Sequence, residues 1–80
     1  TTWRFSLPSA GNTDLGIYDT RGRLVRRLSN GPLEAGEHAV NWNSRDDKGR
    51  SVAAGTYFGK LKVEMGGQSS VQVRKIIILH

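Results

Sequence analysis

Apolar and polar side chains alternate along most of this chain with a period of two, which is typical of strands that bury one face. The first such run covers residues 2–7, where Trp3, Phe5 and Leu7 share one side. The same period continues in five further runs, at residues 13–18, 23–28, 37–43, 55–65 and 69–79. No stretch has the period of an amphipathic helix. These runs, joined by glycine-rich turns, predict an all-β sandwich of six to seven strands.

The two longest runs differ in regularity. Residues 55–65 place one set of side chains on one face, namely Tyr57, Gly59, Leu61, Val63 and Met65. The other face carries Phe58, Lys60, Lys62 and Glu64. In residues 69–79, Val71 and Val73 have one parity, whereas Ile76 and Ile78 have the other. This change of phase predicts a bulge or a sheet crossing near Arg74-Lys75.

Residues 13–28 predict a β-hairpin, because two alternating runs flank the turn Asp19-Thr20-Arg21-Gly22. In the second strand, Leu24 and Leu28 are in phase for the core, and Val25 opposes them. We expect the arginines of the hairpin on its solvent face, where charge discourages edge pairing. Gly16 predicts a bulge or a close backbone approach in the first strand.

Two further connections separate the remaining runs. Residues 29–36 are expected to form a loop, since they contain Asn30-Gly31-Pro32. A second turn, Asp46-Asp47-Lys48-Gly49, lies between Trp42 and Tyr57. Aspartate hydrogen-bonds to its own backbone and glycine accepts positive φ, so such a turn forms easily. We expect the two large rings to pack beneath this central connection.

The composition describes a small basic domain. The 80 residues carry a net charge of +5. They include no cysteine, and this absence excludes disulfides, thiolate metal sites and a cysteine nucleophile. The longest apolar run, Ile76-Ile77-Ile78-Leu79, is four residues long, against roughly 18 for a membrane span. Basic residues are spread along the chain and the aromatics lie mostly in core phase, so no nucleic-acid partner is expected. We expect one domain over residues 1–80, without membrane insertion.

No group of side chains predicts a metal ion or an acid–base pair. His38 lies in an apolar-phase strand and His80 ends the sequence, and neither has the convergent partners of a metal site. Asp46 and Asp47 are adjacent on a turn, where carboxylates diverge. Lys48 occupies a position that a calcium loop gives to an acid. A structural role is therefore expected for His38 and for the acidic turn.

Nucleophilic catalysis and phosphate binding also have no support. Ser51 and the other serines lack a paired base, and no glycine-rich segment matches a phosphate loop. Glycan binding stays open as a lesser alternative, because Phe58 is the one aromatic residue expected to be exposed on a strand. We therefore expect no enzyme site and no cofactor.

Motifs spread over nearly the whole chain resemble the Ig-like domain of two bacterial families. These are the C-terminal sorting domains of proteins exported by the type IX secretion system, and the Ig-like domain of the flagellar hook-capping protein. The resemblance rests on Phe5-Ser6-Leu7-Pro8, on residues 17–26 with Leu28, on Ala35-Gly36-Glu37-His38 before Trp42, on residues 46–58, and on Lys75 before the final aliphatic run. The shared fold signature consists of Tyr18, Asp19, Gly22, Trp42, Asp46, Asp47, Gly49, Gly55 and Tyr57. The resemblance implies an Ig-like (fibronectin III-like) antiparallel β-sandwich.

The resemblance to sorting domains implies a non-catalytic C-terminal module of a larger secreted bacterial protein, itself commonly a hydrolase. The module would be a folded signal for export by the type IX secretion system and for cell-surface attachment. The parent protein would then pass through the periplasm to the surface, and the partner would be the outer-membrane secretion machinery. Recognition would fall on the terminal strand, at Lys75, Ile76, Ile77, Ile78 and Leu79.

The resemblance to the hook-capping protein implies a different role. The module would then be a structural spacer or a subunit-contact domain, and its partner a neighbouring domain or subunit. Exposed edge strands, rather than the terminal strand, would form the contact surface. The isolated domain is expected to be monomeric.

Overall fold

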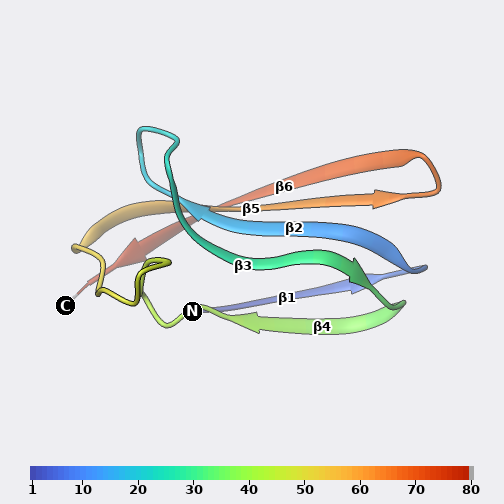
Figure 1. The fold of residues 1–80 in the computed structure, drawn as a ribbon, viewed down its shortest axis with the longest axis horizontal. Helices are drawn as coiled ribbons and strands as arrows, with labels where there is room; N and C mark the ends of the chain where they lie inside the picture. The colour runs from blue at the N-terminus through green and yellow to red at the C-terminus, as the bar shows by residue number, and fades with distance from the viewer. Residues whose placement is uncertain (80) are drawn as a thin grey trace.

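The structure, a computed structural model, describes residues 1–79; His80, set aside above as a metal ligand, lies outside the described residues. Its strands are β1 (Thr2–Leu7), β2 (Gly11–Tyr18), β3 (Leu24–Leu33), β4 (Gly36–Asn41), β5 (Gly55–Met65) and β6 (Gln68–Ile78). They form two antiparallel sheets, β1–β4 and β3–β2–β5–β6 (Figure 1). The predicted antiparallel sandwich is confirmed, with six strands. Within residues 1–79, no helix is long and apolar enough to cross a membrane.

The core lies between the two sheets and divides into two clusters of buried side chains. The first consists of Trp3, Leu7, Leu15, Leu61 and Val63. The second consists of Ile17, Trp42, Tyr57, Ile76 and Ile78. The alternation in residues 2–7 and 55–65 therefore predicted the buried faces of β1 and β5 correctly.

Phe5 and His38 are cross-strand partners at the border of this core. Their rings stack with centroids 5.4 Å apart. The His38 Nε2–H donates to the carbonyl oxygen of Glu34 over 2.7 Å. The imidazole therefore has a structural role, as expected.

The pairing of β2 with β3 contains two register shifts, one of them between Leu15 and Gly16. A bulge is therefore present where Gly16 predicted one, but its extra residue lies on β3 and not on β2. Leu28 is the extra residue of one shift and Val25 of the other. Both side chains pack against the core. The predicted inward position of Leu24 is wrong, since its side chain is 41% exposed. Each bulge reverses the phase of the strand, so simple alternation fails here.

β3 continues to Leu33, so the loop predicted over residues 29–36 is wrong for its first five residues. Gly31, with φ of 134°, and Pro32 both lie within the paired strand. Proline is tolerated here because β3 is an edge strand, which needs ladder donors on one side only. The Thr13 hydroxyl also donates to the Gly31 carbonyl oxygen over 3.2 Å, which holds this segment on β2.

β5 and β6 pair without a register shift over their whole length. The bulge or sheet crossing predicted near Arg74-Lys75 is therefore wrong. Ile76 and Ile78 face the core, and Val71 and Val73 face solvent on the opposite side of the strand. The first half of β6 is exposed on both faces. The alternating apolar residues there therefore do not belong to the core.

Candidate functional site

Two turns with the same sequence pattern, Asp-x-x-Gly-Arg, stand at one end of the sandwich. Residues 19–23 join β2 to β3, and residues 46–50 lie between β4 and β5. In each turn, the Oδ1 atom of Asp19 or Asp46 accepts 2.9 Å hydrogen bonds from the amides two and four residues later. Gly22 and Gly49 have φ of 81° and 80°, which favours glycine, and each donates its N–H to the aspartate carbonyl over 3.0 Å.

The final arginine of each turn returns to the aspartate that opens it. Arg23 Nε lies 3.0 Å from Asp19 Oδ2, and Arg50 Nε lies 3.2 Å from Asp46 Oδ2. Hydrogen bonds from the backbone amides of Arg23 and Arg50, with further ones from the other turn amides and the arginine side chains, hold the pKa of both carboxyls below the ordinary value of 3.8. Both carboxylates are therefore ionised at neutral pH and already engaged within their own turns.

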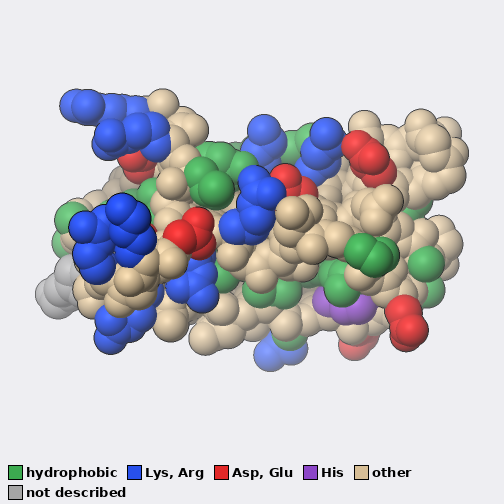
Figure 2. Space-filling model, in the orientation of Figure 1, with side chains coloured by type: hydrophobic (Ala, Val, Ile, Leu, Met, Phe, Trp, Pro, Cys, Tyr) green, Lys and Arg blue, Asp and Glu red, His purple; other side chains and the backbone are tan. Residues whose placement is uncertain are grey.

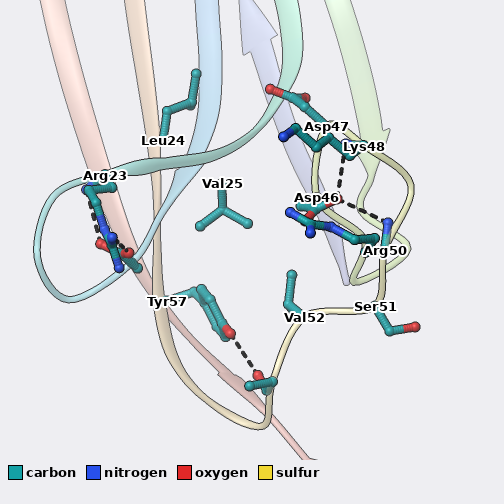
Figure 3. A pocket seen from close by; sticks show the side chains of 12 residues that line it. Arg23, Leu24, Val25, Asp46, Asp47, Lys48, Arg50, Ser51, Val52 and Tyr57 are labelled. Carbon is teal, nitrogen blue, oxygen red and sulfur yellow. Dashed lines mark hydrogen bonds and ion pairs between the residues drawn. The ribbon is translucent and has the colours of Figure 1, made fainter.

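An open concavity of about 620 Å³ lies between the two turns. Figure 3 shows the Arg23 turn on one side of it and residues 46–50 on the other, with Val25, Val52 and Tyr57 between them. The Tyr57 hydroxyl donates to the Ala53 carbonyl oxygen over 2.6 Å. The concavity thus has an apolar floor and charged sides.

The loop between β4 and β5, residues 42–54, is called the central loop below. It is hydrogen-bonded to the outer edge of β3. The Asp47 amide donates to the Val25 carbonyl oxygen, and the Arg27 amide donates to Asp47 Oδ1, both over 3.0 Å. Arg26 Nη1 donates to the Asp46 carbonyl oxygen over 3.1 Å. The loop therefore covers part of this sheet edge. Arg26, expected on the solvent face, instead helps to attach the loop.

Trp42 and Tyr57 pack below the central loop, as the sequence predicted. Their rings meet in a T-shaped arrangement with centroids 5.6 Å apart. Trp42 Nε1 donates to the Arg45 carbonyl oxygen over 2.9 Å, just before the acidic turn. The two rings therefore hold the loop at both of its ends.

These contacts leave the concavity without a reactive group. The aspartates that line it are hydrogen-bonded within the loops that carry them. Ser51 also lines it, but no histidine lies among the lining residues to act as its base. Basic side chains gather at this end of the molecule (Figure 2). In the part of the chain that the structure describes, no three acidic or histidine side chains converge as metal ligands.

The residues expected to carry a sorting signal lie apart from the concavity, on β6 and directly after it. Ile76 and Ile78 are buried in the core. Lys75, Ile77 and Leu79 are exposed. The expected recognition segment therefore offers only part of its side chains to a partner.

Two features of this end of the molecule were absent from the expectations above. The equivalence of Arg23 and Arg50 could have been found, because the Asp-x-x-Gly-Arg spacing occurs twice in the sequence. The attachment of Asp47 to β3 carries no sequence signal, since it joins residues 20 positions apart.

Comparison with known proteins links this geometry to one family. Residues 1–73 match the model of the FlgD Ig-like domain. The basal-body rod modification proteins FlgD of Salmonella typhimurium and Salmonella typhi are each 36% identical over 55 residues, which is 69% of this chain and 24% of those proteins. The crystal structure of FlgD from P. aeruginosa has the same fold, with a TM-score of 0.68 at 24% identity over 96% of this chain and 61% of that one. The chain belongs to the FlgD Ig-like domain family.

Proposed function

We propose that this domain is a non-catalytic assembly module of an exported flagellar protein, and that it makes subunit contacts in a hook-cap-like structure. The observation that carries the proposal is the family match over residues 1–73, which includes both Asp-x-x-Gly-Arg turns. The curated relatives are named basal-body rod modification proteins. Since a shared fold alone does not imply a shared function, the surface chemistry is a second line of support.

The polar groups of the domain support a contact role. Asp19 and Asp46 hold turns, and Asp47 holds the loop on β3. What the surface offers to a partner is an open concavity at one end and exposed apolar side chains on β6. Both are features of docking surfaces.

The proposal includes a larger parent protein that is exported, with residues 1–80 as one of its domains. The matched part of the chain corresponds to 24% of the length of the curated relatives, which supports a parent with further segments. Its partners would be neighbouring subunits or domains of the flagellar assembly.

Deletion of residues 1–80 from the parent protein, in its own host, tests this role. We expect the shortened parent to reach the same compartment, while hooks fail to assemble in electron micrographs and motility is lost. A parent that is still exported and still supports normal hooks would overturn the proposal. A parent in which an unrelated Ig-like sandwich replaces the domain distinguishes two roles. Hooks that still fail to assemble indicate specific contacts by this domain, and normal hooks indicate that it is only a spacer.

A second candidate function is the folded signal for type IX secretion. Exposed Ile77 and Leu79 beside Lys75 are the observation that favours it. The family and relatives found by comparison give it no support. The same deletion would then trap the parent in the periplasm, and Lys75→Ala would reduce export without unfolding the domain. Normal export of both variants would reject this candidate.

A further inference from the structure

The two edge strands of the four-stranded sheet, β3 and β6, differ in whether another segment is hydrogen-bonded to their outer edge. The outer edge of β3 is hydrogen-bonded to Asp47 of the central loop. Within residues 1–79, no backbone hydrogen bond reaches the outer edge of β6. Figure 1 shows the first part of β6 along the border of the molecule, before the strand crosses behind β5 and β2. An edge strand of 11 residues therefore presents unpaired amide and carbonyl groups to solvent.

The outward face of β6 carries three exposed apolar side chains beside Lys75. Val71, Val73 and Ile77 have the same parity and are 51%, 60% and 53% exposed. Phe58 lies beside them on β5, opposite Lys75. A row of exposed β-branched side chains on an unpaired edge is unusual for an isolated soluble domain, because such edges promote pairing with another strand.

The charges near this edge are unbalanced. On the outer face, Asp14 is paired with Arg27 and Glu64 with Lys62. Of the basic side chains on β5 and β6, Lys60, Arg74 and Lys75 have no ion-pair partner in the described chain. Lys60 lies over the Tyr18 ring and Arg74 over the Trp3 ring instead. The surroundings of the edge are therefore positive.

We propose that the outer edge of β6 is a docking site for an extended segment of another protein, which adds to the sheet as a fifth strand. The segment has apolar side chains opposite Val71, Val73 and Ile77, and acidic side chains near Arg74 and Lys75. Backbone hydrogen bonds supply the affinity, and the alternating side chains supply the specificity. This inference rests on the proposed assembly role, because it names the chemistry of the partner in that assembly.

A second copy of this domain does not fit the same edge. Antiparallel pairing of two β6 strands would bring the basic groups of both copies to one seam, with Arg74 and Lys75 from each. Like charges on neighbouring strands are destabilising, and lysine on an edge strand is a common device against self-pairing. The charge pattern therefore selects an acidic partner.

The test uses the purified parent protein and a synthetic extended peptide with valines at the positions opposite Val71, Val73 and Ile77 and glutamates opposite Arg74 and Lys75. We expect the peptide to bind and to protect the amides of residues 68–78, and not those of β3, from hydrogen exchange. A peptide with lysine in place of glutamate should not bind. A valine–glutamate peptide that is N-methylated on every residue, which removes the backbone donors of both edges, should not bind either.

Lys75→Glu should weaken peptide binding by roughly threefold, the size of one exposed charge pair. Lys48→Glu, on the central loop, changes the net charge equally and should have no effect. Absence of binding by the acidic peptide, equal binding by the lysine or N-methylated peptide, or equal effects of the two variants would each overturn the inference. Protection of β6 that rises with protein concentration alone would identify a second copy as the occupant and also overturn it.

Failure of this inference can be told apart from failure of the assembly role. If deletion of residues 1–80 abolishes hooks while the acidic peptide does not bind, the assembly role stands and the β6 edge is not the site. If the deletion leaves hooks normal, the assembly role itself is wrong.

Discussion

The indole ring of Trp3 lies directly against the backbone of Gly59. A Cβ atom at Gly59 would collide with carbon atoms of the indole. Trp3 comes from β1 and Gly59 from β5, so this contact joins the two sheets. The guanidinium of Arg74 covers the same ring, 4.6 Å from its centroid. Glycine is needed at position 59 for the close approach of a large ring, since the backbone there has no positive φ.

Gly59→Ala should destabilise the domain by about 1–3 kcal/mol, the cost of overpacking a filled core. Trp3 is buried and cannot move away easily. Chemical denaturation of the two proteins measures the difference. In a Trp3→Leu background, the smaller side chain leaves space, and the same Gly59→Ala change should cost little. Equal costs in the two backgrounds would show that the indole contact is not the reason for glycine.

Acid should weaken the fold through the two Asp-x-x-Gly-Arg turns. The pKa of Asp19 and of Asp46 is lower in the folded chain than the ordinary value of 3.8. Their stabilising contribution is therefore complete above that value and is lost as the pH falls through the lowered folded pKa. We expect the free energy of unfolding to decrease below about pH 4. Denaturation curves recorded across this range measure it.

The variant Asp19→Asn with Asp46→Asn provides the comparison. Asparagine keeps an acceptor oxygen for the turn amides but has no carboxyl to protonate. The double variant should be less stable at neutral pH, and its stability should depend less steeply on pH below about 4. The pair Glu34→Gln with Glu37→Gln, at two exposed positions, is the matched removal of two negative charges. An unchanged acid profile in the double variant would contradict the role of these turns.

Asp47→Ala should open the outer edge of β3. It removes the acceptor of the Arg27 amide and a carboxylate 3.8 Å from Arg26 Nε. The expected loss is about 1 kcal/mol, the net value of one hydrogen bond. Hydrogen exchange at the Arg27 amide should become faster. Asp47→Asn retains an acceptor oxygen and should preserve much of the protection; equally fast exchange in both variants would argue against this hydrogen bond.

Tyr57→Phe should loosen the entry to β5 and the floor of the concavity. The hydroxyl of Tyr57 donates to Ala53 over 2.6 Å, and its loss leaves a partly buried carbonyl without that donor. We expect a decrease of about 1 kcal/mol in the free energy of unfolding. Tyr18→Phe, on the outer face, is the matched control and should change stability much less. A larger loss of unfolding free energy in Tyr18→Phe than in Tyr57→Phe would contradict the stabilising role of the Tyr57 hydroxyl.

The sequence was informative where structure is local. In residues 55–65, the period of two identified the buried face, because each side chain's direction follows from the pleat of its own strand. The turn at Asp19 was also predicted, since aspartate and glycine supply its hydrogen bonds and positive φ within a few residues. Trp42 and Tyr57 were expected below the central loop and lie there.

The sequence failed where a strand's phase depends on its partners. Val25 and Leu28 both point to the core because bulges against β2 add a residue twice. On β6, Val71 and Val73 resemble a core pattern, yet they face solvent, because the unbroken register with β5 sets the parity of the strand. Neither result is visible in the strand's own residues, since register is a property of two strands together.

The sequence by itself therefore determined the sandwich, its turns and most of the buried faces. Only the tertiary structure decided which sheet edge is covered and which is free, and which charges remain unpaired. Asp47 reaches β3 over 20 positions of sequence, and no such contact covers β6. The physical reason is that strand periodicity and turn chemistry act between neighbouring residues. Edge coverage and charge pairing arise only once distant segments are brought together by the packing of the two sheets.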